Sequence, residues 1–336
     1  MSTNSSPRNR YHRDFSGRMS RRLLLLGAAT GAVALGLPHN RFGGSISGVE
    51  LYARCSFGAY AMDTAGHEEL EARVGAQLRR YVAFHDLPSV GGGDGWPQVD
   101  ADWCARTGHD LVIAWDIHTD INLNGDQLLA GAINDQLDSF FNKAKAFPNK
   151  VSLRMWWEFN DGNGRKVGNY PTAWPGGYAQ WRDGWRYVVD RAKATGAHVS
   201  RGGNVTFFWC ANGADATGLR MEEFWPGAEY VDMIGLDAYN DHGAPWTEFA
   251  DKIQPMMNRI LKLPGATGKP LGIGETGSVD INNGKANWYR NLFMTTKWGD
   301  LKVVDFFSAV GEADWRIDHP ESLRAVSAEF LRKAPR

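Results

Sequence analysis

The sequence has few cysteines and almost no net charge. Its 37 basic and 38 acidic side chains give a formal net charge of −1 over 336 residues. Because a phosphate-binding surface needs an excess of positive charge, this balance argues against a nucleic-acid partner. The three cysteines allow at most one disulfide, with Cys55 and Cys104 as the candidate pair because Cys210 lies in an apolar strand, and buried free thiols are the commoner state. No CxxC motif and no His/Cys cluster indicates a metal, so we expect neither a metal nor a cofactor.

Nucleotide-binding motifs, repeats and long linkers are also absent from the sequence. No GxGxxG or GxxxxGK[ST] motif follows the first predicted strand, which argues against a doubly wound open sheet. No Pro/Thr/Ser-rich linker and no appended binding module is recognisable further along the chain. We therefore expect residues 49–336 to form one domain.

Arginine is concentrated at the beginning of the chain. Six arginines and one acidic residue lie before an apolar run that covers residues 23–37. This run is shorter than the about 20 residues that a membrane span needs, and Arg21 and Arg22 before it resemble a twin-arginine export signal. We expect residues 1–37 to be a signal peptide, residues 38–48 a short linker, and the exported protein to be a secreted monomer. An uncleaved membrane anchor is the alternative.

After the linker, short apolar runs alternate with longer amphipathic segments, the pattern of repeated βα units. Eight such runs, each followed by a helical or long loop segment, predict a single closed (β/α)8 barrel, the TIM barrel of the α/β class. The predicted strands are residues 49–55, 80–85, 111–116, 151–158, 205–210, 230–236, 270–275 and 303–309.

Two of the intervening segments carry clear helical stripes. One stripe follows Asp126, which we expect to be the N-cap, and consists of Leu129, Ile133, Leu137 and Phe141. The other consists of Tyr178, Trp181, Trp185, Val188 and Ala192.

The fourth predicted strand ends at a glutamate, at the position where TIM barrels carry their functional residues. Alternation along this strand places Arg154 and Glu158 on one face. Aromatic neighbours desolvate Glu158 and raise its pKa, which keeps the carboxyl protonated as an acid, while the charge of Arg154 opposes that shift. A structural Arg–Glu ion pair is the alternative interpretation.

The seventh predicted strand is otherwise apolar and ends at Glu275. Gly272 and Gly274 leave room on one face for a bulky neighbour, and Gly277 permits a sharp exit. A carboxylate that ends an apolar strand needs a partner or a task. Because the fourth and seventh strands face each other across the barrel, we expect the two glutamates about 5–5.5 Å apart, the spacing of a retaining glycosidase with one nucleophile and one acid/base.

These strand ends resemble glycoside hydrolase family 26, the secreted β-mannanases and related endo-glycanases of a clan of retaining barrels. The resemblance implies Glu158 as acid/base and Glu275 as nucleophile. It further implies that Tyr239 orients the nucleophile, that Arg154 tunes one of the two glutamates, and that Trp315 forms the platform under the sugar. The matching segments run in order between about residues 50 and 318, namely residues 154–160, 178–197, 204–209, 230–240, 269–277 and 314–317.

One residue departs from the family pattern. The family usually places His immediately before the acid/base, where this chain has Trp157, whose indole can only donate a hydrogen bond. Asn160 or His118 could supply the missing polar contact to the sugar, although each also has an ordinary structural explanation. Asp237 either binds a sugar hydroxyl or braces the sixth strand. The departure leaves the two-carboxylate reaction intact and the identity of the sugar open.

The chain is also rich in tryptophan, with 14 residues of this type. Aromatic rings in loops suit the flat apolar faces of pyranose rings, and packing in the core is the alternative explanation for each. Candidates for the lining of a substrate groove are Trp96, Trp115, Trp156, Trp174 and Trp246, with Trp209 as a further supporting residue.

Together these observations predict a secreted retaining endo-β-glycosidase that acts on a polysaccharide, with β-1,4-mannan the default by resemblance. The first alternative is a retaining barrel of the same clan acting on β-glucan, xylan or a cell-envelope polysaccharide. A non-catalytic carbohydrate-binding barrel is less favoured, because a binder needs no pair of carboxylates. A metal-dependent hydrolase or deacetylase would need grouped ligands, for which the chain offers only a loose set: His85, Asp86, Asp116 and His118.

Overall fold

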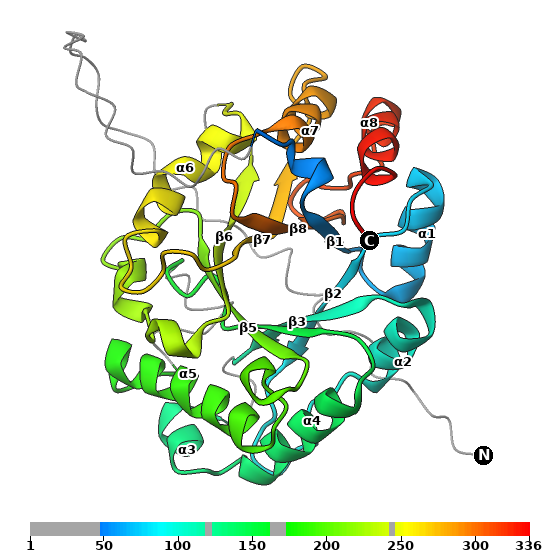
Figure 1. Cartoon of the computed structure of the whole chain (residues 1–336). Helices are drawn as coiled ribbons and strands as arrows, with labels where there is room; N and C mark the ends of the chain where they lie inside the picture. Colours follow the sequence, from blue (N-terminus) through cyan, green and yellow to red (C-terminus); the bar gives the residue numbers. More distant parts are fainter. Residues whose placement is uncertain (1–47, 118–122, 162–172, 242–245) are drawn as a thin grey trace, which may run out of the picture.

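The computed structural model describes residues 48–117, 123–161, 173–241 and 246–336. Eight parallel strands close into one barrel, each pairing with the next along the chain and the last pairing with the first. Figure 1 shows these strands at the centre and the helices in a ring outside them. The predicted (β/α)8 barrel is therefore confirmed. The strands are β1 (Ser56–Tyr60), β2 (Arg80–Asp86), β3 (Asp110–Asp116), β4 (Val151–Met155), β5 (Val205–Asn212), β6 (Met233–Asn240), β7 (Leu271–Ser278) and β8 (Leu301–Phe307).

The helices begin and end at residues suited to those positions. The side chain of Asp63 caps the first helix by accepting a hydrogen bond from Gly66 N, and Gly75 ends that helix in the left-handed conformation (φ 62°). Gly108 ends the second helix in the same way (φ 84°) and turns the chain toward β3. The helices are α1 (Thr64–Val74), α2 (Gln98–Thr107), α3 (Gly125–Leu129), α4 (Asn134–Ala146), α5 (Gly177–Ala194), α6 (Phe249–Ile260), α7 (Lys285–Met294) and α8 (Glu321–Leu331).

Buried apolar side chains form two separate layers. The larger layer lies between the strands and the surrounding helices, and it includes Trp181 and Trp185 of α5. The smaller layer fills the inside of the barrel with side chains such as Phe84, Phe208 and Phe307. Lower in the barrel, Arg80 and Asp305 form a buried two-point ion pair at 2.9 and 3.0 Å. The lumen is thus a packed core, which leaves chemistry to the ends of the strands and the loops after them.

Several predicted strand limits are wrong. The first strand is Ser56–Tyr60 rather than residues 49–55, where Leu51–Ala53 forms a short 3₁₀ helix instead. Gly58 made the true strand inconspicuous in the sequence. It is needed there because a Cβ at this position would lie 2.3 Å from Asp305 Oδ1. The sixth strand begins at Met233 rather than at residue 230. The fourth ends at Met155, so Glu158 lies beyond it.

The first predicted helical stripe spans two helices rather than one. Asn124, not Asp126, is the N-cap of α3, and it forms a reciprocal capping box with Gln127. The helix is interrupted between Leu129, where α3 ends, and Asn134, where α4 begins and continues the apolar stripe. The second stripe is confirmed, since α5 buries Trp181, Trp185, Val188 and Ala192.

The expectations for the N-terminal segment fall on residues 1–47, which lie outside the described residues. Within the described ranges, no helix has the length and apolar character needed to cross a membrane. All three cysteines are buried free thiols, so the candidate Cys55–Cys104 disulfide does not form. Burial raises the pKa of the Cys55 thiol to about 12.

Candidate active site

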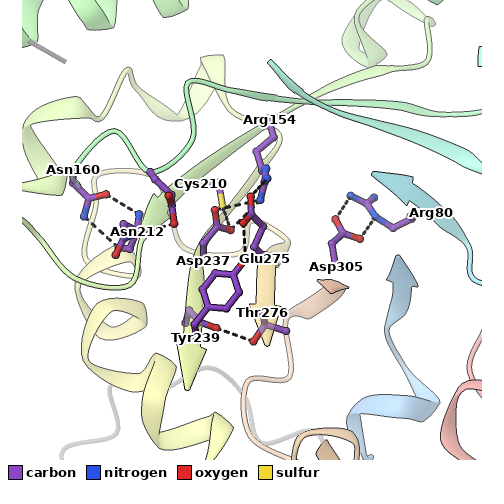
Figure 2. A network of polar contacts seen from close by, with 12 residues as sticks. Arg80, Arg154, Asn160, Cys210, Asn212, Asp237, Tyr239, Glu275, Thr276 and Asp305 are labelled. Carbon is purple, nitrogen blue, oxygen red and sulfur yellow. Dashed lines mark hydrogen bonds and ion pairs between the residues drawn. The ribbon is translucent and has the colours of Figure 1, made fainter. Parts of the chain in front are cut away.

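Glu275 lies on β7 at the centre of a polar cluster inside the barrel (Figure 2). Its Oε2 accepts a hydrogen bond from the Tyr239 hydroxyl at 2.6 Å. Its Oε1 accepts a short hydrogen bond from Nη2 of Arg154. The carboxylate is therefore held from two sides, by a neutral donor on β6 and by a cation on β4.

Arg154 also pairs with Asp237 of β6, from Nη1 to both carboxylate oxygens at 3.0 and 3.2 Å. Burial acts against its charge, but Asp237 and Glu275 raise the pKa of Arg154, so the guanidinium stays charged. Asp237 itself is almost completely buried, and its Oδ1 also accepts a hydrogen bond from the Cys210 thiol at 3.0 Å. Of the two predicted roles of Asp237, the contacts favour the structural one.

A β-bulge brings the two carboxylates of this cluster side by side. The pairing of β6 and β7 shifts register so that Leu236 lies opposite Ile273 while Asp237 lies opposite Glu275, which leaves Gly274 without a partner in the ladder. A Cβ on Gly274 would lie 2.5 Å from Arg154 Nη1 and 2.7 Å from Asp237 Oδ1. The glycine expected to admit a bulky neighbour therefore admits the ion pair beside the candidate nucleophile.

Glu158 lies in a turn after β4 rather than on the strand. Both Trp156 (φ 46°) and Glu158 (φ 53°) adopt the left-handed conformation, which is costly for side chains of this size. The turn is held by a hydrogen bond from Glu158 N to Cys210 O at 3.0 Å. This geometry breaks the alternation that placed Arg154 and Glu158 together, and Arg154 accordingly pairs with Glu275 and Asp237 instead.

The side chain of Glu158 is oriented by an amide that the sequence analysis missed. Asn212, the last residue of β5, donates from Nδ2 to Glu158 Oε1 at 3.0 Å. Asn160 fixes Asn212 in turn, accepting from its backbone N at 2.7 Å and donating to its carbonyl at 3.2 Å (Figure 2). Asn160 is fully buried and also donates to Asp215 Oδ1, so it cannot reach a sugar. Asn212 could have been found from the sequence, because it is a polar residue just beyond the end of a predicted apolar strand, where TIM barrels carry functional residues.

The two glutamates occupy different electrostatic environments. Desolvation, followed by the charges of Asp237, Glu275 and Asp161, raises the pKa of Glu158 well above its usual range, and the more distant Arg154 only partly opposes this. This shift favours the protonated form of Glu158, which is the form that a general acid needs. Glu275 has an arginine in direct contact with one oxygen and a phenol on the other. The environment of Glu158 favours its protonated form, while Glu275 faces a fixed positive charge. Paired carboxylates that act as acid and nucleophile need such a difference.

Trp157 and Trp315 lie on different sides of the cluster. Trp157 is buried and covers the guanidinium, with Arg154 Cζ 5.2 Å from its ring centroid. The ring of Phe84 packs against it at a tilt, with ring centroids 5.2 Å apart. Trp315 is partly exposed and packs on Tyr239 with ring centroids 4.9 Å apart. Its ring passes over Gly277, where a Cβ would lie 3.0 Å from it. Gly277 therefore makes room for this ring, and β7 continues through it to Ser278.

Most of the tryptophans expected to line a groove belong to the core. The indoles of Trp115, Trp156, Trp174 and Trp209 are at most 1% exposed, because they pack between the barrel and its helices and so cannot touch a polysaccharide. Trp96 is half-buried against Phe140. Trp246 is 37% exposed and remains a candidate.

The loose set of possible metal ligands at the strand ends does not assemble as one site in the described residues. His85 pairs with Asp100 at 2.8 Å. Asp116 accepts a hydrogen bond from Ile117 N. His118, which was also a candidate for the sugar contact, lies outside the described residues.

Comparisons with known proteins agree with this geometry. Residues 153–318 match the model of glycosyl hydrolase family 26, a range that contains both glutamates. Endoglucanase H of Acetivibrio thermocellus is 25% identical over 246 residues, covering 68% of this chain. The chain spans about a quarter of the length of that curated relative.

Solved structures of family members share the fold at low identity. The catalytic domain of the endo-β-1,4-mannanase of Bacillus sp. JAMB-750 superposes with a TM-score of 0.56 and 15% identity, over 82% of this chain and 85% of that one. The family 26 domain of a Prevotella bryantii endo-β-mannanase/endo-β-glucanase gives 0.54 and 15%, over 81% and 88%. The β-mannanase of Bacteroides ovatus gives 0.53 and 16%, over 83% and 88%.

Proposed function

Because the chain belongs to glycosyl hydrolase family 26, we propose that it is an exported, retaining endo-β-glycosidase that cleaves β-1,4-linked mannan. The observation that carries the proposal is the unequal treatment of two glutamates. Desolvation and nearby acids raise the pKa of Glu158 and favour its protonated form, whereas Glu275 accepts hydrogen bonds from Arg154 and Tyr239.

In the proposed first step, a carboxylate oxygen of Glu275 attacks the anomeric carbon while Glu158 gives its proton to the departing glycosidic oxygen. The bond between the anomeric carbon and that oxygen breaks, and a glycosyl ester forms on Glu275. In the second step, Glu158, now ionised, takes a proton from water as the water oxygen attacks the same carbon. The ester breaks and both glutamates return to their starting states.

The supporting residues have defined tasks in this scheme. Arg154 and Tyr239 hold the nucleophile in position. They also stabilise the negative charge that returns to the Glu275 carboxylate when the ester breaks. Asn212 donates to Oε1 of Glu158 and so orients the carboxyl group that must first donate and then accept a proton. Trp315, partly exposed beside Tyr239, offers the apolar face on which a pyranose ring stacks.

β-Glucan is the second candidate substrate. The curated relative is named an endoglucanase, and Trp157 replaces the polar residue expected beside the acid/base. The buried indole of Trp157 covers Arg154, so the sugar contact at that place must come from other groups. Export through the N-terminal arginine pair is part of the proposal and would be checked by following the chain into the medium or periplasm after Arg21 and Arg22 are changed to Lys.

The test is a panel of mannans, β-glucans, xylans and bacterial envelope glycans, with reducing ends measured over time. We expect reducing ends to appear fastest on β-1,4-mannan, and Glu275→Gln to abolish them while polysaccharide binding persists. Glu329→Gln, which changes a half-exposed glutamate of α8, is the matched control and should retain full activity. Binding without hydrolysis by the unchanged protein would favour the non-catalytic alternative.

A further inference from the structure

Two histidines and a glutamate meet outside the barrel, between α1 and α2. His67 and Glu71 lie one turn apart on α1, and His109 follows Gly108 at the end of α2. One ligand atom from each lies within 4.8 Å of the others. His67 packs on Tyr81, which belongs to the layer between strands and helices, so the cluster is separate from the glutamates inside the barrel.

The hydrogen-bond pattern at His109 leaves two acceptors facing each other. The single hydroxyl hydrogen of Thr107 goes to the carbonyl of Trp103 at 2.8 Å, so the hydroxyl oxygen accepts from His109 Nδ1 at 2.7 Å. A neutral His109 then presents a lone pair at Nε2, and this atom lies 2.9 Å from Glu71 Oε1. Two acceptors at that distance need a positive charge between them, which only an added proton or a metal ion can supply.

His67 presents a further nitrogen to the same oxygen. Its side chain is completely buried, and among the described residues its ring nitrogens make no hydrogen bond of normal length and geometry, only weak contacts with the Glu71 carboxylate and the Ala59 backbone. Its Nε2 lies 3.5 Å from Glu71 Oε1. A buried imidazole without a hydrogen bond is costly unless something else occupies its nitrogen.

Glu71 supplies the negative charge. Its Oε1 lies 2.9 Å from His109 Nε2 and 3.5 Å from His67 Nε2, so the carboxylate faces both imidazoles. The side chain is held in place by Leu78 N, which donates to Oε1 at 2.6 Å. The cluster therefore combines one carboxylate with two imidazoles, of which one is oriented by a hydroxyl behind it, the arrangement that metal-binding histidines require.

We propose that His67, Glu71 and His109 form a structural site for a divalent ion of the zinc class, which ties α1 to the turn between α2 and β3. Nitrogen and carboxylate ligands favour zinc over magnesium or calcium, which take mostly oxygen. The surroundings are apolar, since Trp103 stacks on His109 at 4.6 Å and meets the edge of His67 at 5.6 Å. No sequence pattern indicates this site, because His109 lies 38 residues from Glu71.

The experiment is a zinc titration of the full chain, followed by gel filtration and metal analysis by mass spectrometry. We expect about one zinc ion per chain, and an increase in Tm of at least about 5 °C at a hundredfold excess over the dissociation constant. Glu71→Gln and His67→Gln should retain less than about a tenth of that zinc and lose the shift in Tm.

His198→Gln is the matched control. His198 is equally buried and pairs with Asp232 at 3.0 Å, but it belongs to no group of three ligands, so this variant should bind zinc normally. Equal zinc retention by Glu71→Gln and the unchanged protein, or no retention by either, would overturn the proposal. If the variants do not fold, X-ray absorption of the unchanged protein with zinc decides. Two imidazoles in the zinc shell support the site, and a shell without imidazole contradicts it.

Discussion

Arg154 and Glu275 are joined across the inside of the barrel by a charge-assisted hydrogen bond, although they lie on β4 and β7 and are separated by 121 positions in the chain. The same guanidinium also holds Asp237. One buried cation therefore serves two buried carboxylates, and among the described residues no cation forms an ion pair with Glu158. In the proposed mechanism, this difference assigns proton donation to Glu158 and nucleophilic attack to Glu275.

Replacing Arg154 by Met should cost both stability and activity. Loss of the cation leaves two buried carboxylates without charge compensation, which lowers the free energy of unfolding by about 3–5 kcal/mol. We expect kcat/KM to fall by at least about 100-fold because the nucleophile loses its electrostatic support. Urea unfolding and initial rates measure the two effects.

Arg191→Met is the control for this change. Its ion pair with Asp138 is partly exposed, so stability should change by only about 0.2–1 kcal/mol and kcat/KM should stay constant. Full activity of Arg154→Met would contradict the assignment of Arg154 to the nucleophile.

Asn212→Ala should act on the acid/base rather than on the nucleophile. The amide of Asn212 donates to Glu158, which favours the ionised form, so its removal raises the pKa of Glu158 further. We expect the alkaline limb of the kcat/KM–pH profile to move to higher pH, with a loss of about tenfold at the optimum from poorer positioning. Asn291→Ala changes an exposed residue of α7 whose amide donates to Glu248, and it should leave the profile unchanged. A uniform loss of activity with an unmoved alkaline limb would make Asn212 merely structural.

Glu158→Gln should make the protein more stable at alkaline pH while abolishing its activity. The folded-state pKa of Glu158 is raised, so the folded protein binds a proton that the unfolded chain has already lost above its ordinary pKa. The contribution of this proton to stability is complete at low pH and is lost as pH rises through the folded pKa. Glutamine avoids that loss.

Thermal unfolding at pH 5 and pH 8 tests the direction of this pH dependence of stability. The Tm of Glu158→Gln minus that of the unchanged protein should increase from the lower to the higher pH. A difference that stays constant or shrinks would mean that Glu158 is ionised in the folded protein, and its role as proton donor would be wrong.

Gly274→Ala should disturb the cluster through space alone. The new methyl would meet Arg154, Asp237 and Cys210 at 2.5–2.7 Å, so we expect a loss of about 1–3 kcal/mol in stability together with reduced kcat. Gly93→Ala places a methyl in open space and should change neither quantity. If Gly274→Ala behaves like Gly93→Ala, the close packing of the ion pair against β7 is not needed for activity.

The barrel and its two glutamates were predictable because each left a local signal. Eight apolar runs separated by amphipathic segments indicate eight βα units, and an acid at the end of an apolar strand is conspicuous. The first strand was misplaced because it contains Gly58, whose task of admitting Asp305 depends on a strand almost 250 residues away. Sequence patterns register alternation, but they do not register a close approach of this kind.

The partners of the glutamates could not be predicted for a related reason. Assigning Arg154 to Glu158 assumed regular alternation, which Trp156 and Glu158 break by taking positive φ values, and the bulge at Gly274 then aims Glu275 at Arg154. Both irregularities lie at the candidate active site, where local rules are commonly broken. Trp115 and Trp209 were misassigned because a tryptophan at a strand end has the same sequence signature whether it faces the core or a ligand.

Azide rescue of two variants tests the division of roles between the glutamates most directly. Each variant is given an activated aryl β-glycoside and sodium azide, and the anomeric configuration of the glycosyl azide is read by NMR. Glu158→Ala keeps the nucleophile, so azide attacks the glycosyl ester and should give the β-azide with retained configuration. Glu275→Ala lacks the nucleophile, so azide attacks the substrate directly and should give the inverted α-azide. The same anomer from both variants, or the α-azide from Glu158→Ala, would contradict the account.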